Sequence, residues 1–245
     1  MSLVRSLLFS TPLLILATIV MWLISFLAAL FDHSGNASHY IARAWGKILL
    51  GVSFIRVSAR GVEKLDPHGT YVFVANHSSY MDIPAVLSRL PQQFRFFAKK
   101  GLYSIPFLGW HLRWAGHVPV DRSNARNSLK SMNEAGRIIA ARQVCMLIFP
   151  EGGRSAHGLR EFREGAAYLA IKAGVPVVPI AIAGMRELLP VGSIHIRSGR
   201  VELRVGDPIP TKGLRSSDRE RLTERLHQEV EALLEQSSGA AGTRG

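Results

Sequence analysis

Residues 6–31 carry no charged side chain, and this run constrains the fold more than any other feature of the sequence. Twenty of its 26 residues are apolar. A helix of that length rises about 39 Å, which exceeds the hydrocarbon thickness of a bilayer, about 30 Å. Pro12 falls in the first turns, where a helix tolerates proline. We therefore expect residues 1–52 to form a membrane-associated helical segment that spans the bilayer with tilt or lies partly in it.

Two other interpretations of the uncharged run remain open. A cleaved signal peptide fits less well, because the apolar region is longer than a typical signal core and only Arg5 precedes it. A buried helix of a soluble protein also fits the composition, but few such helices stay uncharged over this length.

Basic residues indicate how the chain sits on the membrane. Residues 38–52 can form a second helix, whose apolar face lies either at the headgroup interface or against the rest of the domain. Arg43, Lys47, Arg56 and Arg60 all follow the uncharged run. By the positive-inside rule, we expect a protein of the cytoplasmic membrane with its C-terminal part on the cytoplasmic side.

The charge balance indicates the kind of partner. The 245 residues include 30 Lys and Arg against 18 Asp and Glu, a formal charge of +12. Such an excess favours an anionic partner: a phospholipid surface, nucleic acid or a phosphorylated substrate. The basic residues are dispersed and form no nucleic-acid-binding motif, so we expect no nucleic acid. The single cysteine, Cys145, excludes an internal disulfide, and the scattered histidines have no zinc-ligand spacing.

After residue 53, short apolar runs alternate with amphipathic ones. This pattern predicts an α/β domain over residues 53–236, with a largely parallel central sheet flanked by helices. The remaining residues, 237–245, are expected to be a disordered tail. The predicted strands are residues 54–61, 71–76, 95–100, 117–121, 144–150, 175–184 and 200–209, and the predicted helices are residues 127–143, residues 163–174 and a last one from Ser217.

Charged or imidazole side chains follow four of the predicted strands. In open α/β sheets, chemistry gathers at the carboxyl ends of the strands. We therefore expect these side chains to share one site: His77, Lys99, Lys100, Asp121, Arg122, Glu151 and Arg154.

His77 and Asp82 form a candidate general base. The carboxylate could bond one ring nitrogen, fix the tautomer and leave the other nitrogen to take a proton. An isolated pair at this spacing is more often a capping or solvated pair, but its place at a strand end favours chemistry. Ser78 and Ser79 are weak candidates for a nucleophile, because the chain lacks a G-x-S-x-G elbow. The better target of the base is a hydroxyl of a substrate.

Residues 149–158, "FPEGGRSAHG", resemble an anion-binding loop. Gly152 and Gly153 free the backbone so that its N–H groups can face a phosphate, and Arg154 can contact it in bidentate fashion. A plain glycine-rich turn is the simpler alternative. Lys100 and Arg122 would add positive charge, although a lone surface cation is usually just solvated.

Four blocks, taken together and in order, resemble the 1-acyl-sn-glycerol-3-phosphate acyltransferase family of glycerolipid acyltransferases. "NHSSYMD" at 76–82 resembles its N-H-x4-D block, and "AKKGLYSIPFLGW" at 98–110, followed by "VPVDRSN" at 118–124, its second. "FPEGGRS" at 149–155 resembles F-P-E-G-T-R-S, and residues 162–182 resemble the last block. Gly153 replaces the usual Thr, and Gly101 stands where Glu or Ser is common.

The resemblance implies transfer of a fatty acyl group from acyl-CoA or acyl-carrier protein to the free hydroxyl of 1-acyl-sn-glycerol-3-phosphate, giving phosphatidate for phospholipid synthesis. His77 would be the general base and Asp82 its partner. The acceptor would be held by Lys100, Arg122, Glu151, Gly152 and Arg154. No metal or other cofactor is implied. The alternatives are an acyltransferase for another lysolipid, such as lyso-ornithine lipid, and a non-catalytic protein that binds anionic lipid or nucleic acid.

Overall fold

The centre of the molecule is a seven-stranded sheet, seen in a computed structural model that describes residues 2–106, 108–121 and 125–242. The order across the sheet is β1-β7-β6-β2-β5-β3-β4. All seven predicted strands are present, and their bounds are β1 Ile55–Arg60, β2 Val72–Ala75, β3 Phe94–Lys99, β4 Val118–Val120, β5 Cys145–Ile148, β6 Val177–Ala183 and β7 Gly199–Val205.

The strand directions decide where a site can form. Every neighbouring pair is parallel except β6 and β7, which are antiparallel. The prediction of a largely parallel sheet is therefore confirmed. Because β1 and β7 run opposite to the other five strands, their amino ends lie at the same edge as the carboxyl ends of β2 to β6.

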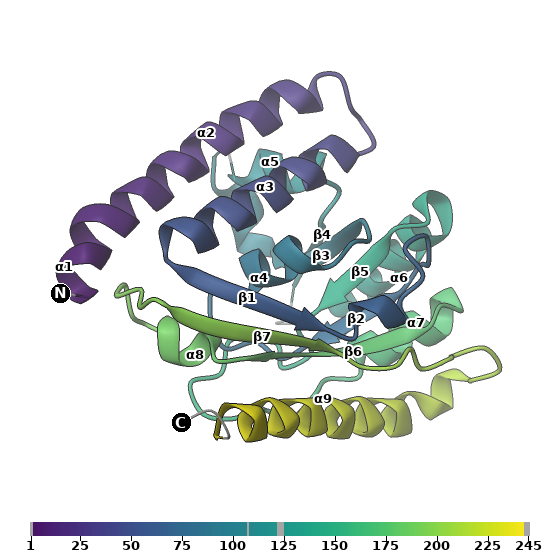
Figure 1. The fold of residues 1–245 in the computed structure, drawn as a ribbon. Helices are drawn as coiled ribbons and strands as arrows, with labels where there is room; N and C mark the ends of the chain where they lie inside the picture. The colour runs from purple at the N-terminus through teal and green to yellow at the C-terminus, as the bar shows by residue number, and fades with distance from the viewer. Residues whose placement is uncertain (1, 107, 122–124, 243–245) are drawn as a thin grey trace.

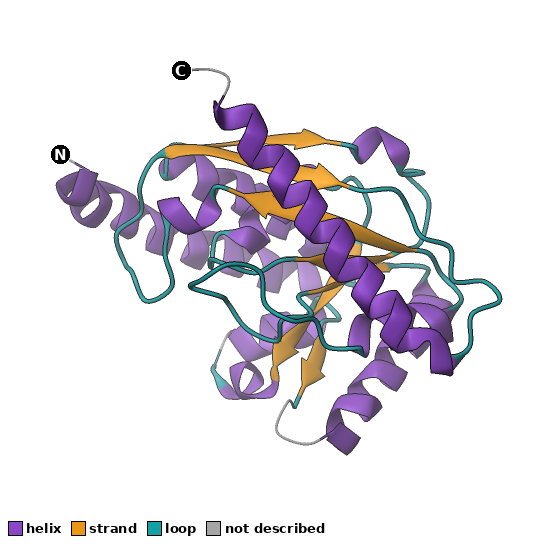
Figure 2. Ribbon diagram, turned by 90° about the horizontal axis from the view of Figure 1, so that it is seen from below, coloured by secondary structure: helices purple, strands orange, loops and turns teal. Residues whose placement is uncertain are grey.

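Both faces of the sheet are covered, which explains why β2 is an unbroken apolar run. Phe73 and Ala75 of β2 pack into the core beneath α3 (Asn36–Val52) and α4 (Asp82–Arg89). Val72 and Val74 point to the other face. That face is covered by α6 (Ala125–Arg142), α7 (Gly165–Ala173) and α9 (Arg219–Gly242). Figure 2 shows α9 lying across the strands.

The N-terminal segment is one long helix that docks on α3. It consists of α1 (Ser2–Arg5), a π-helical turn (Ser6–Ser10) and α2 (Thr11–Ala29). Its polar side chains face the domain. Ser10 Oγ donates to Val52 O at 3.1 Å, the Trp45 indole N–H donates to Thr18 Oγ1 at 3.0 Å, and Ser25 Oγ lies 3.0 Å from His111 Nδ1.

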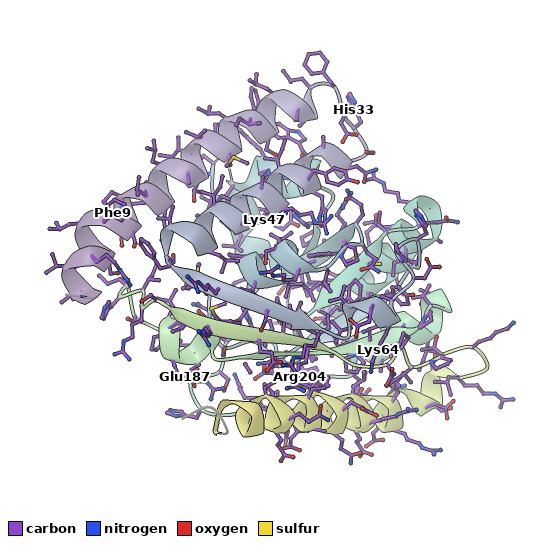
Figure 3. The ribbon with its side chains drawn as sticks, viewed as in Figure 1. Phe9, His33, Lys47, Lys64, Glu187 and Arg204 are labelled. Carbon is purple, nitrogen blue, oxygen red and sulfur yellow. The ribbon has the colours of Figure 1, made fainter. Side chains whose placement is uncertain are left out.

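The opposite side of this helix is apolar and exposed. Leu8 is 77 % exposed, and Figure 3 shows Phe9 pointing away from the domain. By length and composition, residues Leu3–Ala29 could cross a membrane, and only 6 % of their most apolar window is buried. The segment is therefore unlike the core helix of a soluble protein, and its exposed face indicates association with a membrane.

The C-terminal end differs from the expectation. Helix α9 continues to Gly242, so residues 237–242 are helical where we predicted a disordered tail beyond residue 236. Ser237 Oγ donates to the carbonyl of Leu233 at 3.0 Å, as within a continuing helix. Ala240 and Ala241 have high helix propensity, which favours the longer helix.

Three short elements complete the path to the site. Helix α5 spans Leu108–Trp114 and follows a 3₁₀ turn at Lys100–Ser104. Helix α8, Met185–Leu188, follows β6 at the edge where the parallel strands end (Figure 1).

Candidate active site

His77 and Asp82 meet at the carboxyl end of β2. His77 Nδ1 lies 2.9 Å from Asp82 Oδ2, and the Asp82 side chain is fully buried while that of His77 is 15 % exposed. The same oxygen accepts the backbone N–H groups of Ser78 at 2.7 Å and Ser79 at 2.8 Å. The carboxylate therefore fixes both the turn and the ring.

This contact assigns the two ring nitrogens of His77. An ionised carboxylate only accepts hydrogen bonds, so Nδ1 carries the hydrogen that points to Asp82. Nε2 then keeps its lone pair and can accept a proton. The structure thus brings together the predicted pair in the arrangement that a general base requires.

Glu151 holds the backbone of His77. Its Oε1 accepts the His77 N–H at 2.6 Å, and its Oε2 accepts the Arg160 N–H at 3.1 Å. Burial raises the pKa of this carboxyl above its ordinary value, while the hydrogen bonds from His77 and Arg160 act in the opposite direction. The Ser155 N–H donates to the His77 carbonyl at 2.8 Å. Both peptide groups of His77 are thus tied to the loop after β5.

Asn76 fastens β2 to β6 just before His77. Its side-chain Nδ2 donates to the Ile182 carbonyl at 3.0 Å, and its Oδ1 accepts the Ile182 N–H at 2.7 Å. Burying an amide costs little free energy when both its N–H and its oxygen are hydrogen-bonded, and this pairing fixes the spacing of the two strand ends. The position of His77 is therefore set from three sides: by Asp82, by Glu151 and by Asn76.

The Phe149 ring stacks on the imidazole of His77, with centroids 4.1 Å apart and an interplanar angle of 19°. We did not predict this contact. Phe149 also lines an apolar cavity of about 680 Å³ between the carboxyl ends of β4 and β5 and the first turns of α6 and α7. A smaller, more polar cavity of about 210 Å³ is lined by His77, Glu151 and Arg186. His77 thus lines the polar cavity, and Phe149, which stacks on it, lines the apolar one.

The predicted cations take different positions. Arg154 places its guanidinium 3.3 Å from the centroid of the Tyr80 ring, next to the His77 turn. Lys100 is exposed beyond β3, at the same edge but two strands away from β2. Arg122 lies outside the described residues. Gly152 has a left-handed φ of +76°, and an added Cβ would lie 3.0 Å from Arg163 Nε, so this position requires glycine.

Arg186 was missed, although it follows a strand end like the residues that we did predict. Its Nη2 donates to the Gly158 carbonyl at 3.1 Å, and its buried Nε has no hydrogen-bond partner in the described part of the chain. This guanidinium lines the polar cavity together with His77. An anionic group in that cavity would satisfy the free N–H.

Metal ligation has no candidate among the described residues, where no group of three or more His, Cys, Asp or Glu lies close enough to hold an ion. The site as it stands consists of a half-buried histidine on a buried aspartate, a glycine-rich loop and two arginines at one edge of an α/β sheet. These features define an α/β protein with a histidine–carboxylate pair where the parallel strands end.

The sequence comparison identifies the family. A family model described as Acyltransferase matches residues 56–183, which include His77, Asp82, Glu151 and Arg154. This chain belongs to the acyltransferase family, as predicted from its motifs.

Named relatives agree with this assignment. The chain is 36 % identical over 184 residues to 1-acyl-sn-glycerol-3-phosphate acyltransferase BAT2, chloroplastic, from Brassica napus, a match that covers 74 % of this chain and 53 % of the relative. It is 32 % identical over 177 residues to the alpha enzyme of that name from Bos taurus, covering 72 % and 62 %. The chain thus spans about half to three-fifths of the length of these relatives.

A solved structure matches almost the whole chain. It is the 1-acyl-sn-glycerophosphate acyltransferase PlsC from Thermotoga maritima, with a TM-score of 0.82 and 26 % identity over 97 % of this chain and 98 % of that one. The predicted fold, glycerolipid acyltransferase-like with an N-terminal helical segment, is confirmed.

Proposed function

We propose that this protein transfers a fatty acyl group from a thioester donor to the free hydroxyl of 1-acyl-sn-glycerol-3-phosphate, giving phosphatidate for phospholipid synthesis. The observation that carries the proposal is the His77–Asp82 contact, which orients the ring at a strand end with Nδ1 on the carboxylate and Nε2 away from it. The names of the relatives and of the matching structure support the substrate class.

The chemistry requires one proton acceptor. His77 Nε2 takes the hydroxyl proton as the acceptor oxygen attacks the thioester carbonyl. Asp82 stabilises the imidazolium that forms. The tetrahedral intermediate collapses, the carbon–sulfur bond breaks, and the proton passes from Nε2 to the leaving thiolate. The products are an ester and a free thiol, so no oxidant or reductant is needed. General-base catalysis of this kind contributes about 10²–10⁴-fold.

The two cavities suit two parts of the substrates. The apolar cavity beside Phe149 has room for a hydrocarbon chain. The guanidinium of Arg186 lines the polar cavity and can pair with an anionic oxygen of the acceptor or of the donor. Arg154, Lys100 and Arg122 would add to the positive potential at this edge. Glu151 and Gly152 would act indirectly, because they hold the loop and the His77 backbone.

The N-terminal helix would place this site at the membrane that holds the acceptor. The N-terminal helix packs on the domain along one side, where Ser10 and Thr18 contact α3 and Ser25 contacts His111 of α5, so lipid would contact only its other side. We infer that the helix and the domain approach the bilayer together, on the cytoplasmic side that the basic residues favour. The donor would be acyl-CoA or acyl-carrier protein from the aqueous phase.

One assay with several acceptors tests this function. Membranes that contain the protein receive acyl-CoA and, separately, acyl-carrier protein, each with lysophosphatidate, lysophosphatidylcholine or lyso-ornithine lipid, and the products are identified by mass spectrometry. We expect phosphatidate from lysophosphatidate with at least one donor. Acylation of another lysolipid in its place would assign a different acceptor, and no acylated product with any pair would contradict the function.

A further inference from the structure

The loop between α8 and β7, residues 189–198, exposes apolar side chains at the active-site edge of the sheet. Ile194 is 73 % exposed, more than any other large apolar side chain that the structure describes after residue 31. Val191 is 38 % exposed. The tip is a tight turn, in which the Ser193 N–H donates to the Pro190 carbonyl at 3.1 Å and Gly192 has a φ of +82°. Such a turn projects Val191 outward.

One end of this loop is tied to the N-terminal helix. The Ile196 N–H donates to Ser6 Oγ at 2.9 Å, and both residues are buried. Figure 1 shows the loop beside the amino end of the chain, and Figure 2 shows the same arrangement from below. The loop is therefore held next to the first turns of the N-terminal helix.

The other end of the loop is tied to the catalytic turn. Ser79 Oγ donates to the Leu189 carbonyl at 2.9 Å, and the Ser79 N–H donates to Asp82. The loop thus runs from the His77–Asp82 turn to the first turns of the membrane helix. A membrane that contacts the first turns of the N-terminal helix would therefore lie close to this loop.

Exposed cations flank the loop. Arg197 lies within it, and Arg200 of β7 pairs in register with Arg56 of β1. None of these three side chains has a carboxylate partner in the described part of the chain. Adjacent arginines without counter-ions repel one another, so this edge favours anions from outside. Apolar tips with flanking cations are typical of segments that enter an anionic lipid interface.

We propose that the α8–β7 loop is a second lipid-binding element. Val191 and Ile194 enter the boundary between headgroups and acyl chains beside the N-terminal helix. Arg197 and Arg200 bind anionic headgroups. These contacts hold the sheet edge that carries His77 against the bilayer. The lipid contact itself does not depend on acyl transfer, whereas its effect on substrate access rests on the proposed function.

A fluorescent probe on the loop tests the contact directly. Cys145 is 1 % exposed, and burial raises its pKa to about 12, so a thiol reagent would leave it unmodified in the folded protein. Ile194→Cys, Leu16→Cys on the outer side of α2 and Gln228→Cys on exposed α9 each add one reactive thiol. The full chain, labelled with an environment-sensitive fluorophore, is reconstituted in vesicles that contain anionic phospholipid.

The three sites should respond differently to two quenchers. At positions 194 and 16, we expect strong quenching by lipids with a nitroxide on the acyl chain and protection from aqueous iodide. At position 228 we expect the reverse. A probe at 194 that is quenched by iodide like the one at 228, and not by nitroxide lipid, would overturn the proposal. The loop would then face water, as it would if it bound a protein partner.

An activity comparison tests the consequence. For Ile194→Asp we expect acyl transfer to fall about tenfold with the acceptor in vesicles, but not with the acceptor in detergent micelles. Leu214→Asp, an exposed leucine in the loop after β7, is the matched control and should leave both rates unchanged. Arg197→Gln with Arg200→Gln should remove the dependence of the vesicle rate on anionic lipid.

The outcomes separate the proposals. If Ile194→Asp and the unaltered chain transfer acyl groups at equal rates to the acceptor in vesicles, the loop does not affect access to the substrate, and that part of the proposal is contradicted. If the unaltered chain transfers no acyl group, the proposed function fails while the quenching experiment still decides the lipid contact. If Ile194→Asp does not fold, judged by its thermal midpoint, the labelled Ile194→Cys protein provides the test.

Discussion

The backbone N–H of His77 donates to Glu151 Oε1 at 2.6 Å across 74 residues of sequence, so the carboxylate after β5 positions the histidine after β2. Glu151 was predicted among the residues that hold the substrate. The structure instead shows both of its oxygens on backbone N–H groups, those of His77 and Arg160. We therefore regard Glu151 as a positioning residue.

Glu151→Gln tests this role. The amide oxygen can accept only one of the two N–H groups, and the amide nitrogen then faces the other donor. We expect kcat to fall about 10–100-fold, with little change in KM for the acceptor, because the ring is displaced while the binding groups stay. Glu151→Asp, which keeps both acceptors on a shorter side chain, should retain more activity. An increase in KM alone would instead indicate direct contact with the acceptor.

Asp82→Asn should lower kcat more than Glu151→Gln does. All three hydrogen bonds go to Asp82 Oδ2, so the asparagine oxygen can take them over, but its NH2 group then occupies the buried position of Oδ1, which has no partner in the described part of the chain. The neutral amide also no longer stabilises the imidazolium that forms, so we expect kcat to fall about 10³–10⁴-fold. The measurement is thiol release under saturating donor and acceptor, compared with Ser88→Ala as a nearby control on α4. A loss of less than tenfold would show that the reaction does not depend on the charge of Asp82.

The two glycines of the anion loop, Gly152 and Gly153, should differ in how much a substitution lowers stability. Gly152 has a left-handed φ of +76° with the Arg163 guanidinium packed against it, so Gly152→Ala should lower the free energy of unfolding by about 1–2 kcal/mol. Nothing lies within 4 Å of a Cβ at Gly153, whose φ is outside that region, so Gly153→Thr should fit without such a cost. The thermal midpoints of both variants check this contrast, and equal midpoints would contradict it.

Gly153→Thr also tests whether this position affects the choice of acceptor lipid. It restores the hydroxyl that the resembling family usually has at this place, next to Arg154. We expect the variant to keep its activity and to change the ratio of rates between lysophosphatidate and other lysolipids. An unchanged ratio would show that this position does not contact the acceptor headgroup.

Two buried histidines, His39 and His117, and the half-buried His111 predict loss of stability in acid. Burial, aided by the charges of Arg95 and Arg43, lowers the pKa of His39 to about 3, and burial also lowers the pKa of His111 and His117. Below about pH 6.5 the unfolded chain binds protons that the folded chain excludes, so the free energy of unfolding falls as pH decreases.

For each of these histidines, the free energy of unfolding should fall by up to about 1.4 kcal/mol per pH unit in this range. The thermal midpoint should therefore be lower at pH 5.5 than at pH 7.5. His39→Leu, which removes a buried imidazole that packs against Phe94, should reduce that difference. The same pH dependence in the variant would contradict the account for His39.

Local patterns predicted much of the structure. The seven strands follow from short apolar runs, and their largely parallel order follows from alternation with helices. His77 and Asp82 are close in sequence, so one turn brings them together. The uncharged N-terminal run predicted an exposed apolar helix.

What escaped prediction depends on contacts between distant residues. The stacking of Phe149 on His77 joins two strand ends, and the contact of Ser25 with His111 joins segments 86 residues apart. The serines and threonines of the N-terminal helix appear in the sequence, but only the fold shows which of them contact the domain. Arg186 escaped prediction although it, too, follows a predicted strand, residues 175–184, with only Met185 between them.

The most direct test of the central claim measures two products at once. Membranes that contain the protein, or its His77→Ala variant, receive a thioester donor and lysophosphatidate, and free thiol and phosphatidate are followed together. We predict equal amounts of both from the unaltered protein and neither from the variant. Full acyl transfer by His77→Ala would contradict the role of His77 as the base, and thiol release without phosphatidate would show that water, rather than the glycerol hydroxyl, is the acceptor.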